Sequence, residues 1–257
     1  MQVEQRGSVR FKTFASFPAG RIVHAVFDRI GGVSPAPYNS LNMSIGTGDT
    51  IENVRENQHR AFQAIGLPLA SMARACQVHG NRTVPVYGQS YNPTKKADAL
   101  ITATPGVALF MSFADCVPIL LYDPVQHVIG IAHAGWRGTV SGICQDVVTK
   151  MGLYFHCHPT DILAAIGPSI SAKNYPVGAE VADAVMRAFP EQNELLPVHN
   201  GKAHFDLWDA NVNALRRCGV KTIQLSQLCT ASCTDQYFSH RAEAGNTGRF
   251  GTVIALK

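Results

Sequence analysis

Three short segments of the chain each contain a side chain that can bind a metal ion. His79 lies in "CQVHGN", Cys116 in "ADCVP" and His133 in "IAHAGWRG". The three are too far apart in sequence for a local zinc finger, but strands of one sheet can bring them together. Two imidazoles and one thiolate form a donor set that suits zinc, and three protein ligands leave a fourth position for water or substrate. The sequence therefore predicts a catalytic zinc site.

The alternative is that these side chains are ordinary core or surface residues, as most of the ten histidines must be. A free cysteine is commonly buried as a small apolar residue. The neighbouring residues favour the metal site, because glycines closely follow both histidines and Asp115 precedes the thiol. A buried aspartate needs a partner. We expect Asp115 to help define the site, either by orienting a histidine or by pairing with a buried arginine.

Three arginines lie beside glycines. Arg137 belongs to "AHAGWRG", where an apolar strand turns into a helical pattern, and such a turn suits an anion. Arg29 in "RIGGVS" and Arg249 in "NTGRF" are the other two. One such pair is more often a turn with a solvated charge, but three in one chain favour phosphate as a ligand.

The composition excludes several classes of protein. The net charge is +4 over 257 residues and the basic residues are scattered, which argues against nucleic-acid binding. No apolar run approaches the roughly 20 residues needed to span a membrane, and the N-terminus has no signal core. The seven cysteines are an odd number in a chain too large to need disulfides. We expect a cytoplasmic protein with reduced thiols and one domain, 1–257.

The apolar pattern predicts a mixed α/β domain. Turn residues at 105–106 and 123–124 suggest that 98–133 forms an antiparallel meander. Helices are expected where apolar residues recur every three or four positions, with Thr50 and Asp206 as N-caps. The expected strands are 21–27, 98–103, 107–113, 117–123, 127–133, 161–167 and 252–257, and the expected helices are 51–65, 140–151, 179–189 and 207–218.

Two further patterns carry little weight. "FHCHP", 155–159, has the His-Cys-His order found near copper in multicopper oxidases, but the other His-x-His pairs of such enzymes are missing from the sequence. We interpret it as a surface loop. "LCTASC", 228–233, has no second cysteine pair, so two structural thiols are expected there.

A series of motifs resembles the YfiH family, whose members are labelled polyphenol oxidases or laccase-domain proteins and are now described as purine nucleoside phosphorylases. The match runs in order from Phe27 to Phe250. The motifs are "FDRIGGVSPAPYNSLNMSIGTGD", "QVHG", "KADALIT", "ADCVPILLYD", "IAHAGWRG", "IGPSI" and "FSHRAEAGNTGR".

The resemblance implies a single-domain four-layer α/β/β/α sandwich with mixed sheets, similar to the catalytic domain of cytotoxic necrotizing factor. It implies one zinc ion on His79, Cys116 and His133, with Cys116 and Asp115 as catalytic residues. The implied reaction is phosphorolysis of adenosine, inosine and methylthioadenosine, together with deamination of adenosine. The substrate-binding residues would be Arg29, Asn42 and Arg137, which match family motif positions and could hold phosphate and ribose.

One position departs from the family pattern. Where the family commonly has Glu-Asn-Arg, this chain has "ENQ", with Gln58 in the place of the arginine. If that arginine holds phosphate, loss of its permanent charge and planar donor fork should weaken phosphate binding. Because of Gln58, the sequence supports phosphorolysis less strongly than it supports the metal site.

Three other functions remain open. A cysteine hydrolase would use Cys116 as nucleophile and His133 as base. A copper-dependent polyphenol oxidase corresponds to the older family label, with copper in place of zinc. A metal-binding regulatory protein would show no turnover but would lose stability on chelation.

Overall fold

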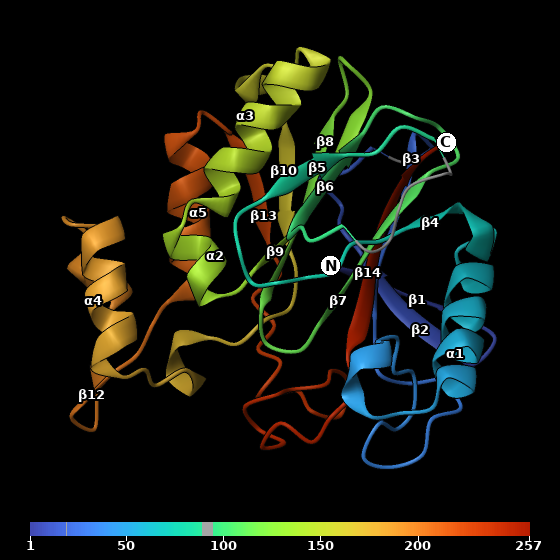
Figure 1. Ribbon diagram of the computed structural model, residues 1–257, viewed down its shortest axis with the longest axis horizontal. Helices are drawn as coiled ribbons and strands as arrows, with labels where there is room; N and C mark the ends of the chain where they lie inside the picture. The colour runs from blue at the N-terminus through green and yellow to red at the C-terminus, as the bar shows by residue number, and fades with distance from the viewer. Residues whose placement is uncertain (19, 89–94) are drawn as a thin grey trace.

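The computed structural model describes residues 1–18, 20–88 and 95–257, and there the chain forms two large β-sheets with helices on either side (Figure 1). The first sheet has six strands, all antiparallel to their neighbours except for the parallel pair of β4 and β7. Its order is β1 (Gln2–Arg6), β2 (Val9–Thr13), β3 (Ile22–Phe27), β14 (Phe250–Leu256), β7 (Ala108–Phe113) and β4 (Met72–Ala73).

The second sheet also has six strands and positions two of the predicted metal ligands, Cys116 and His133. The antiparallel hairpin of β8 and β9 forms its centre, and β6 and β10 pair antiparallel with this hairpin on either side. Each edge strand pairs in parallel with its neighbour, β5 with β6 and β13 with β10. Its order is β13 (Thr222–Leu225), β10 (Leu163–Ile166), β8 (Val117–Asp123), β9 (Val128–Ala134), β6 (Ala99–Thr102) and β5 (Thr83–Pro85). A small hairpin joins β11 (Val198–His199) and β12 (Lys202–Ala203).

The helices begin where the sequence supplies caps. The Thr50 side chain accepts a hydrogen bond from the amide of Asn53, and Asp206 accepts from the amides of Trp208 and Asp209, so both predicted N-caps are confirmed. The helices are α1 (Ile51–Ala64), α2 (Trp136–Val140), α3 (Ile143–Phe155), α4 (Ala179–Ala188) and α5 (Leu207–Arg217). Single 3₁₀ turns lie at Ile45–Thr47, Leu69–Ser71, Pro159–Asp161, Ala172–Asn174 and Asn193–Leu195.

Three apolar cores hold these elements together. Because side chains alternate across a strand, β7 contributes Leu109 and Met111 to the core between the sheets and Phe110 to the core under α1. The third core joins the outer face of the second sheet to α3, α4 and α5. Figure 1 accordingly shows α1 on one side of the molecule and α2 to α5 on the other.

The predicted strands and helices are confirmed, with boundaries shifted by a few residues, but the predicted meander is wrong. β6, β8 and β9 lie in the second sheet, whereas β7 pairs with β14 and β4 in the first. The chain therefore changes sheets between β6 and β7 and again between β7 and β8. Apolar strand patterns do not specify the partner strand, because both faces of all these strands are buried.

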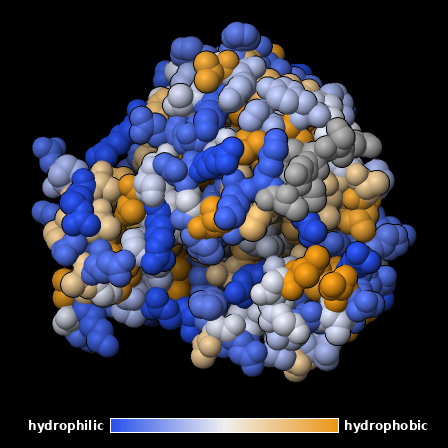
Figure 2. All heavy atoms as spheres, viewed as in Figure 1, coloured by the Kyte–Doolittle hydropathy of each residue, from blue (hydrophilic) through white to orange (hydrophobic). Residues whose placement is uncertain are grey.

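The surface is mainly polar on the face drawn in Figure 2, where apolar residues form separate patches. Within the described residues, no helix combines the length and apolarity that a membrane crossing requires.

Candidate metal centre and its pocket

The ends of two paired strands bring the predicted ligands together. Cys116 immediately precedes β8, and His133 is the penultimate residue of β9, opposite Pro118 in the antiparallel register. His79 comes from the loop between β4 and β5. The ligand atoms of all three residues lie within 4.8 Å of one another, and this is the one group of metal-capable side chains found in the described part of the chain. The structure thus assembles the predicted triad.

Asp98, which precedes β6, holds both histidine-bearing segments. One carboxylate oxygen lies 2.9 Å from His133 Nδ1 and also accepts from the amide of His79 at 2.9 Å. The other oxygen accepts from the amides of Gly80 at 2.8 Å and Val78 at 3.2 Å. With Nδ1 bound to the carboxylate, Nε2 of His133 is left for a metal ion or for the Cys116 thiol.

The electrostatics of the triad favour a charged thiolate. Burial alone would raise the pKa of Cys116, but the adjacent imidazoles of His133 and His79 outweigh it and lower the pKa. Burial likewise opposes protonation of His133, yet the Cys116 thiolate and the Asp98 carboxylate raise its pKa. A metal ion binds a cysteine as the thiolate and a histidine as the neutral imidazole. Where either group still carries its proton, metal binding displaces that proton.

Gly135 is required by the close packing around the thiol. A Cβ atom at this position would lie 3.0 Å from Cys116 Sγ and 3.3 Å from His79 Cδ2. Any larger residue would displace the side chains that form the triad. The glycine that follows the His133 segment therefore permits close approach, as the sequence suggested.

Asp115 lies beside the triad but does not orient a histidine. Its carboxylate accepts hydrogen bonds from the hydroxyls of Thr230 at 2.6 Å and Ser239 at 2.7 Å, and from the amide of Arg241 at 2.6 Å. Its backbone has φ +83°, a strained conformation for a residue with a side chain. The expectation of a histidine partner is wrong for Asp115, because Asp98 occupies that position. Through these hydrogen bonds, Asp115 instead links the segment that begins at Ser239 to the strand end that carries Cys116.

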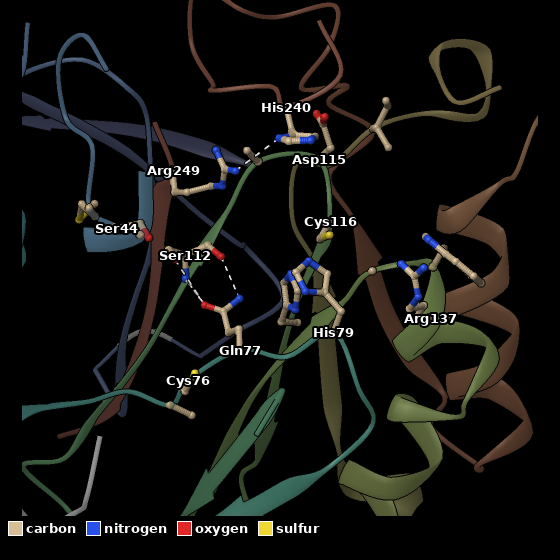
Figure 3. Close-up of a pocket in the computed structure, with 18 of the residues that line it drawn as sticks. Ser44, Cys76, Gln77, His79, Ser112, Asp115, Cys116, Arg137, His240 and Arg249 are labelled. Atoms are coloured by element: carbon tan, nitrogen blue, oxygen red, sulfur yellow. Dashed lines mark hydrogen bonds between the residues drawn. The ribbon is translucent and has the colours of Figure 1, made fainter. Parts of the chain in front are cut away.

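The triad opens into a cavity of about 880 Å³ that carries mainly positive charge. Figure 3 shows Arg249 and Arg137 on opposite sides of Cys116, with His240 and Asp115 above it in the view. Asp115 is the one carboxylate among the lining residues described. The arginines of the lining are Arg74, Arg137, Arg241 and Arg249, and none of them forms an ion pair with a carboxylate in the described part of the chain.

Arg137 lines this cavity, where its role in substrate binding stays a prediction, whereas Arg29 and Asn42 are not among the lining residues. The Arg29 guanidinium is buried, lies 3.0 Å from Glu243 Oε1 and donates to the carbonyls of Asn39 and Thr234. Asn42 is fully buried, and its Oδ1 accepts from the amide of Arg249 at 2.9 Å. Both residues support the 239–249 segment from behind rather than facing the cavity.

Gln58 also lies behind the cavity wall. It is buried on α1, and its amide donates to the carbonyl of Met43 at 3.0 Å, while Met43 itself lines the cavity. An arginine at this position would have to replace that bond or extend past it. The replacement of the family arginine by Gln58 therefore changes the packing behind the cavity wall, not a side chain that lines the cavity.

Sequence reasoning missed the roles of several residues that the structure brings to the site. Asp98 sits in "KADALIT", where an aspartate directly in front of an apolar strand was the available signal. His240 and Arg241 lie in "FSHRAEAGNTGR", where an alternation of basic and small residues offered no chemical pattern. Arg74 and Tyr175 carried no local signal.

Comparisons with known proteins identify the family. A family model described as multi-copper polyphenol oxidoreductase laccase matches residues 23–257. A protein of Deinococcus radiodurans named purine nucleoside phosphorylase is 40% identical over 91% of this chain and 89% of its own length. The Escherichia coli purine nucleoside phosphorylase YfiH is 35% identical over 89% of this chain and 91% of its own. The crystal structure of YlmD from Geobacillus stearothermophilus superposes with a TM-score of 0.91 at 33% identity, covering 99% of this chain and 98% of that one. The chain therefore belongs to the family of the YfiH and YlmD proteins, to which the laccase model also corresponds.

Proposed function

We propose that this protein is a zinc-dependent purine nucleoside phosphorylase that converts adenosine, inosine or methylthioadenosine and phosphate to the free base and a ribose 1-phosphate. The observation that carries the proposal is a His-Cys-His triad inside a large cavity lined by four arginines that form no ion pair with a described carboxylate. Relatives named purine nucleoside phosphorylase at 35 to 40% identity support the same reaction.

The donor set of the triad fits zinc. His79, Cys116 and His133 would hold the ion, with a thiolate already favoured by its surroundings and with Asp98 fixing His133 in the tautomer that leaves Nε2 free. Copper is the alternative ion and corresponds to the family description. When bound, the metal would supply a Lewis acid beside the reacting sugar.

The residues of the chain would bind the two reactants. We assign inorganic phosphate to Arg249 and His240, since the Arg249 guanidinium is held by the carbonyls of Thr247 and Gly248 and lies 3.4 Å from His240 Nδ1. In the reaction a phosphate oxygen bonds to C1′ as the C1′–N9 bond breaks, and the base leaves with the electron pair and takes up the proton that the attacking hydrogen phosphate releases. Arg137 would bind the nucleoside on the other side of Cys116. Asp115 would position Cys116 and the 239–249 segment.

Further parts of the proposal follow from the family resemblance. They comprise adenosine deamination at the same site, a four-layer arrangement similar to the cytotoxic necrotizing factor domain, and action in the cytoplasm. The three separate apolar cores support the layered arrangement. All seven cysteines are free thiols, which supports a reducing compartment.

One observation favours a second candidate, a cysteine hydrolase. Cys116, His133 and Asp98 form a chain of nucleophile, base and orienting carboxylate, which is the arrangement of a catalytic triad. Metal content separates the two candidates, because a bound metal would occupy the thiolate. A metal-free protein that is active and is killed by alkylation of Cys116 would favour the hydrolase.

The deciding experiment measures hypoxanthine release from inosine by protein of known zinc and copper content, with and without phosphate. We expect release that depends on phosphate and is lost in the Cys116→Ser variant. Hypoxanthine release that is independent of phosphate would contradict the proposal. Hypoxanthine release by a Cys116→Ser variant that holds no zinc would also contradict it.

A further inference from the structure

The cavity is rich in positively charged side chains. Four arginines line it, and Asp115 is the one carboxylate among the lining residues described. Like charges gathered around one cavity repel one another, and an anionic ligand relieves that repulsion. The four arginines therefore favour a ligand with more than one anionic group.

Three of the four arginines fall into two groups, with Arg74 in neither, and Figure 3 shows Arg249 and Arg137 on opposite sides of Cys116. Arg249 and His240 form the first group, to which inorganic phosphate is assigned. The second group contains Arg137, Arg241 and Tyr175.

The second group is preorganised to bind an anion. The Arg137 guanidinium stacks on Trp136, 4.2 Å from the ring centroid, which leaves its edge donors free. The Arg241 guanidinium lies 4.9 Å from the Tyr175 ring centroid and donates once, to the carbonyl of Pro176 at 3.0 Å. Its remaining donors have no partner in the described part of the chain.

Tyr175 adds a neutral donor to this group. A phenol with its ordinary pKa of about 10 keeps its proton at neutral pH. Burial raises the pKa of Tyr175 further. Tyr175 lines the cavity, and no hydrogen bond of its hydroxyl to another described residue is present. A protonated phenol beside a guanidinium group is well suited to the oxygens of a phosphate monoester.

We propose that Arg137, Arg241 and Tyr175 form a second anion subsite that binds the 5′-phosphate of a purine nucleoside 5′-monophosphate. The inference rests on the proposed phosphorolysis and extends its substrate class from nucleosides to nucleotides. The bonds that form and break are the same, and the sugar product is ribose 1,5-bisphosphate. A cavity of about 880 Å³ lies in the upper part of the range for small-molecule sites, which leaves room for this larger substrate.

The test compares inosine 5′-monophosphate with inosine on zinc-assayed protein. We expect kcat/KM for phosphate-dependent hypoxanthine release to be about 10- to 100-fold higher for the monophosphate, as two charge-assisted contacts warrant. Arg241→Ala and Tyr175→Phe should reduce this ratio. Arg216→Ala is the matched control, since Arg216 is an exposed arginine of α5 that does not line the cavity.

Equilibrium binding of both compounds, with metal-free and zinc-loaded protein, provides a readout that needs no turnover. Tighter binding of the monophosphate that weakens in Arg241→Ala supports the subsite even if neither compound is cleaved, in which case phosphorolysis alone fails. Turnover of inosine without any preference for the monophosphate in rate or binding would overturn the subsite and leave the proposed function standing.

Discussion

The Asp98→Asn variant tests whether both carboxylate oxygens of Asp98 are needed to hold His79 and His133 in place for metal binding. Asp98 is fully buried and accepts from His133 Nδ1, His79, Gly80 and Val78. An asparagine offers one acceptor oxygen and one NH2 group in the same space. If the oxygen faces His133, the NH2 group opposes the amides of Gly80 and Val78. If the amide is reversed, the NH2 group forces His133 to carry its proton on Nε2, the nitrogen that would bind the metal.

The expected loss follows from these contacts. Removing a residue that orients a metal-bound histidine weakens metal affinity by about 10- to 100-fold, which is about 1.4–2.8 kcal/mol. Loss of charge-assisted hydrogen bonds should lower the free energy of unfolding of the metal-free protein by about 1.5–3 kcal/mol. Competition with a chromophoric zinc chelator measures the first quantity, and urea unfolding measures the second.

Asp28→Asn is the matched control. Asp28 is also a fully buried carboxylate, but its partners are Arg10 and Lys12, outside the cavity. This control should lose stability and keep its zinc affinity. A zinc dissociation constant for Asp98→Asn within twofold of the wild type, or an equal weakening in the control, would refute the role given to Asp98.

Three further predictions concern other parts of the molecule. Gly135→Ala should lower zinc affinity at least about tenfold because its Cβ would lie 3.0 Å from Cys116 Sγ, whereas Gly46→Ala in the same cavity meets no atom within 4 Å and should leave the affinity unchanged in the same chelator assay. Gln58 is buried behind the cavity wall and donates to the Met43 carbonyl, so Gln58→Arg should leave kcat/KM for phosphate within about twofold of the wild type, and a roughly tenfold rise would show that an arginine at this position reaches the phosphate. Burial lowers the pKa of His24 from 6.5 to about 4, so the unfolded state binds more protons between these values, and stability present above pH 6.5 should be lost toward pH 4. Urea unfolding should show this contribution as at most about 1.4 kcal/mol per pH unit, and a His24→Gln variant with the same slope would contradict it.

The sequence by itself determined the local structure and the ligand types. Apolar runs bounded by turn residues located β8 and β9, and the cap residues Thr50 and Asp206 located the starts of two helices. These features depend on residues close in sequence, so periodicity and side-chain chemistry are enough to read them. The triad was predictable for a related reason, since two imidazoles and a thiol at strand ends form a recognisable donor set.

The tertiary structure alone decided which residues meet at that donor set. β7 leaves the expected meander and pairs with β14, and this exchange brings Arg249 beside the Cys116 segment. Asp98 became the orienting carboxylate because β6 pairs with β9, which sets its backbone and side chain against His133.

Burial decided the remaining roles. Arg29 and Arg137 both lie close to glycines in the sequence. The Arg29 guanidinium donates to Glu243 and to two backbone carbonyls, whereas Arg137 lines the cavity. Sequence patterns cannot separate the two, because the same charged group is structural when its donors are satisfied inside the protein and functional when they are left open. That outcome depends on strand pairing between segments far apart in the chain, which local residue patterns do not encode.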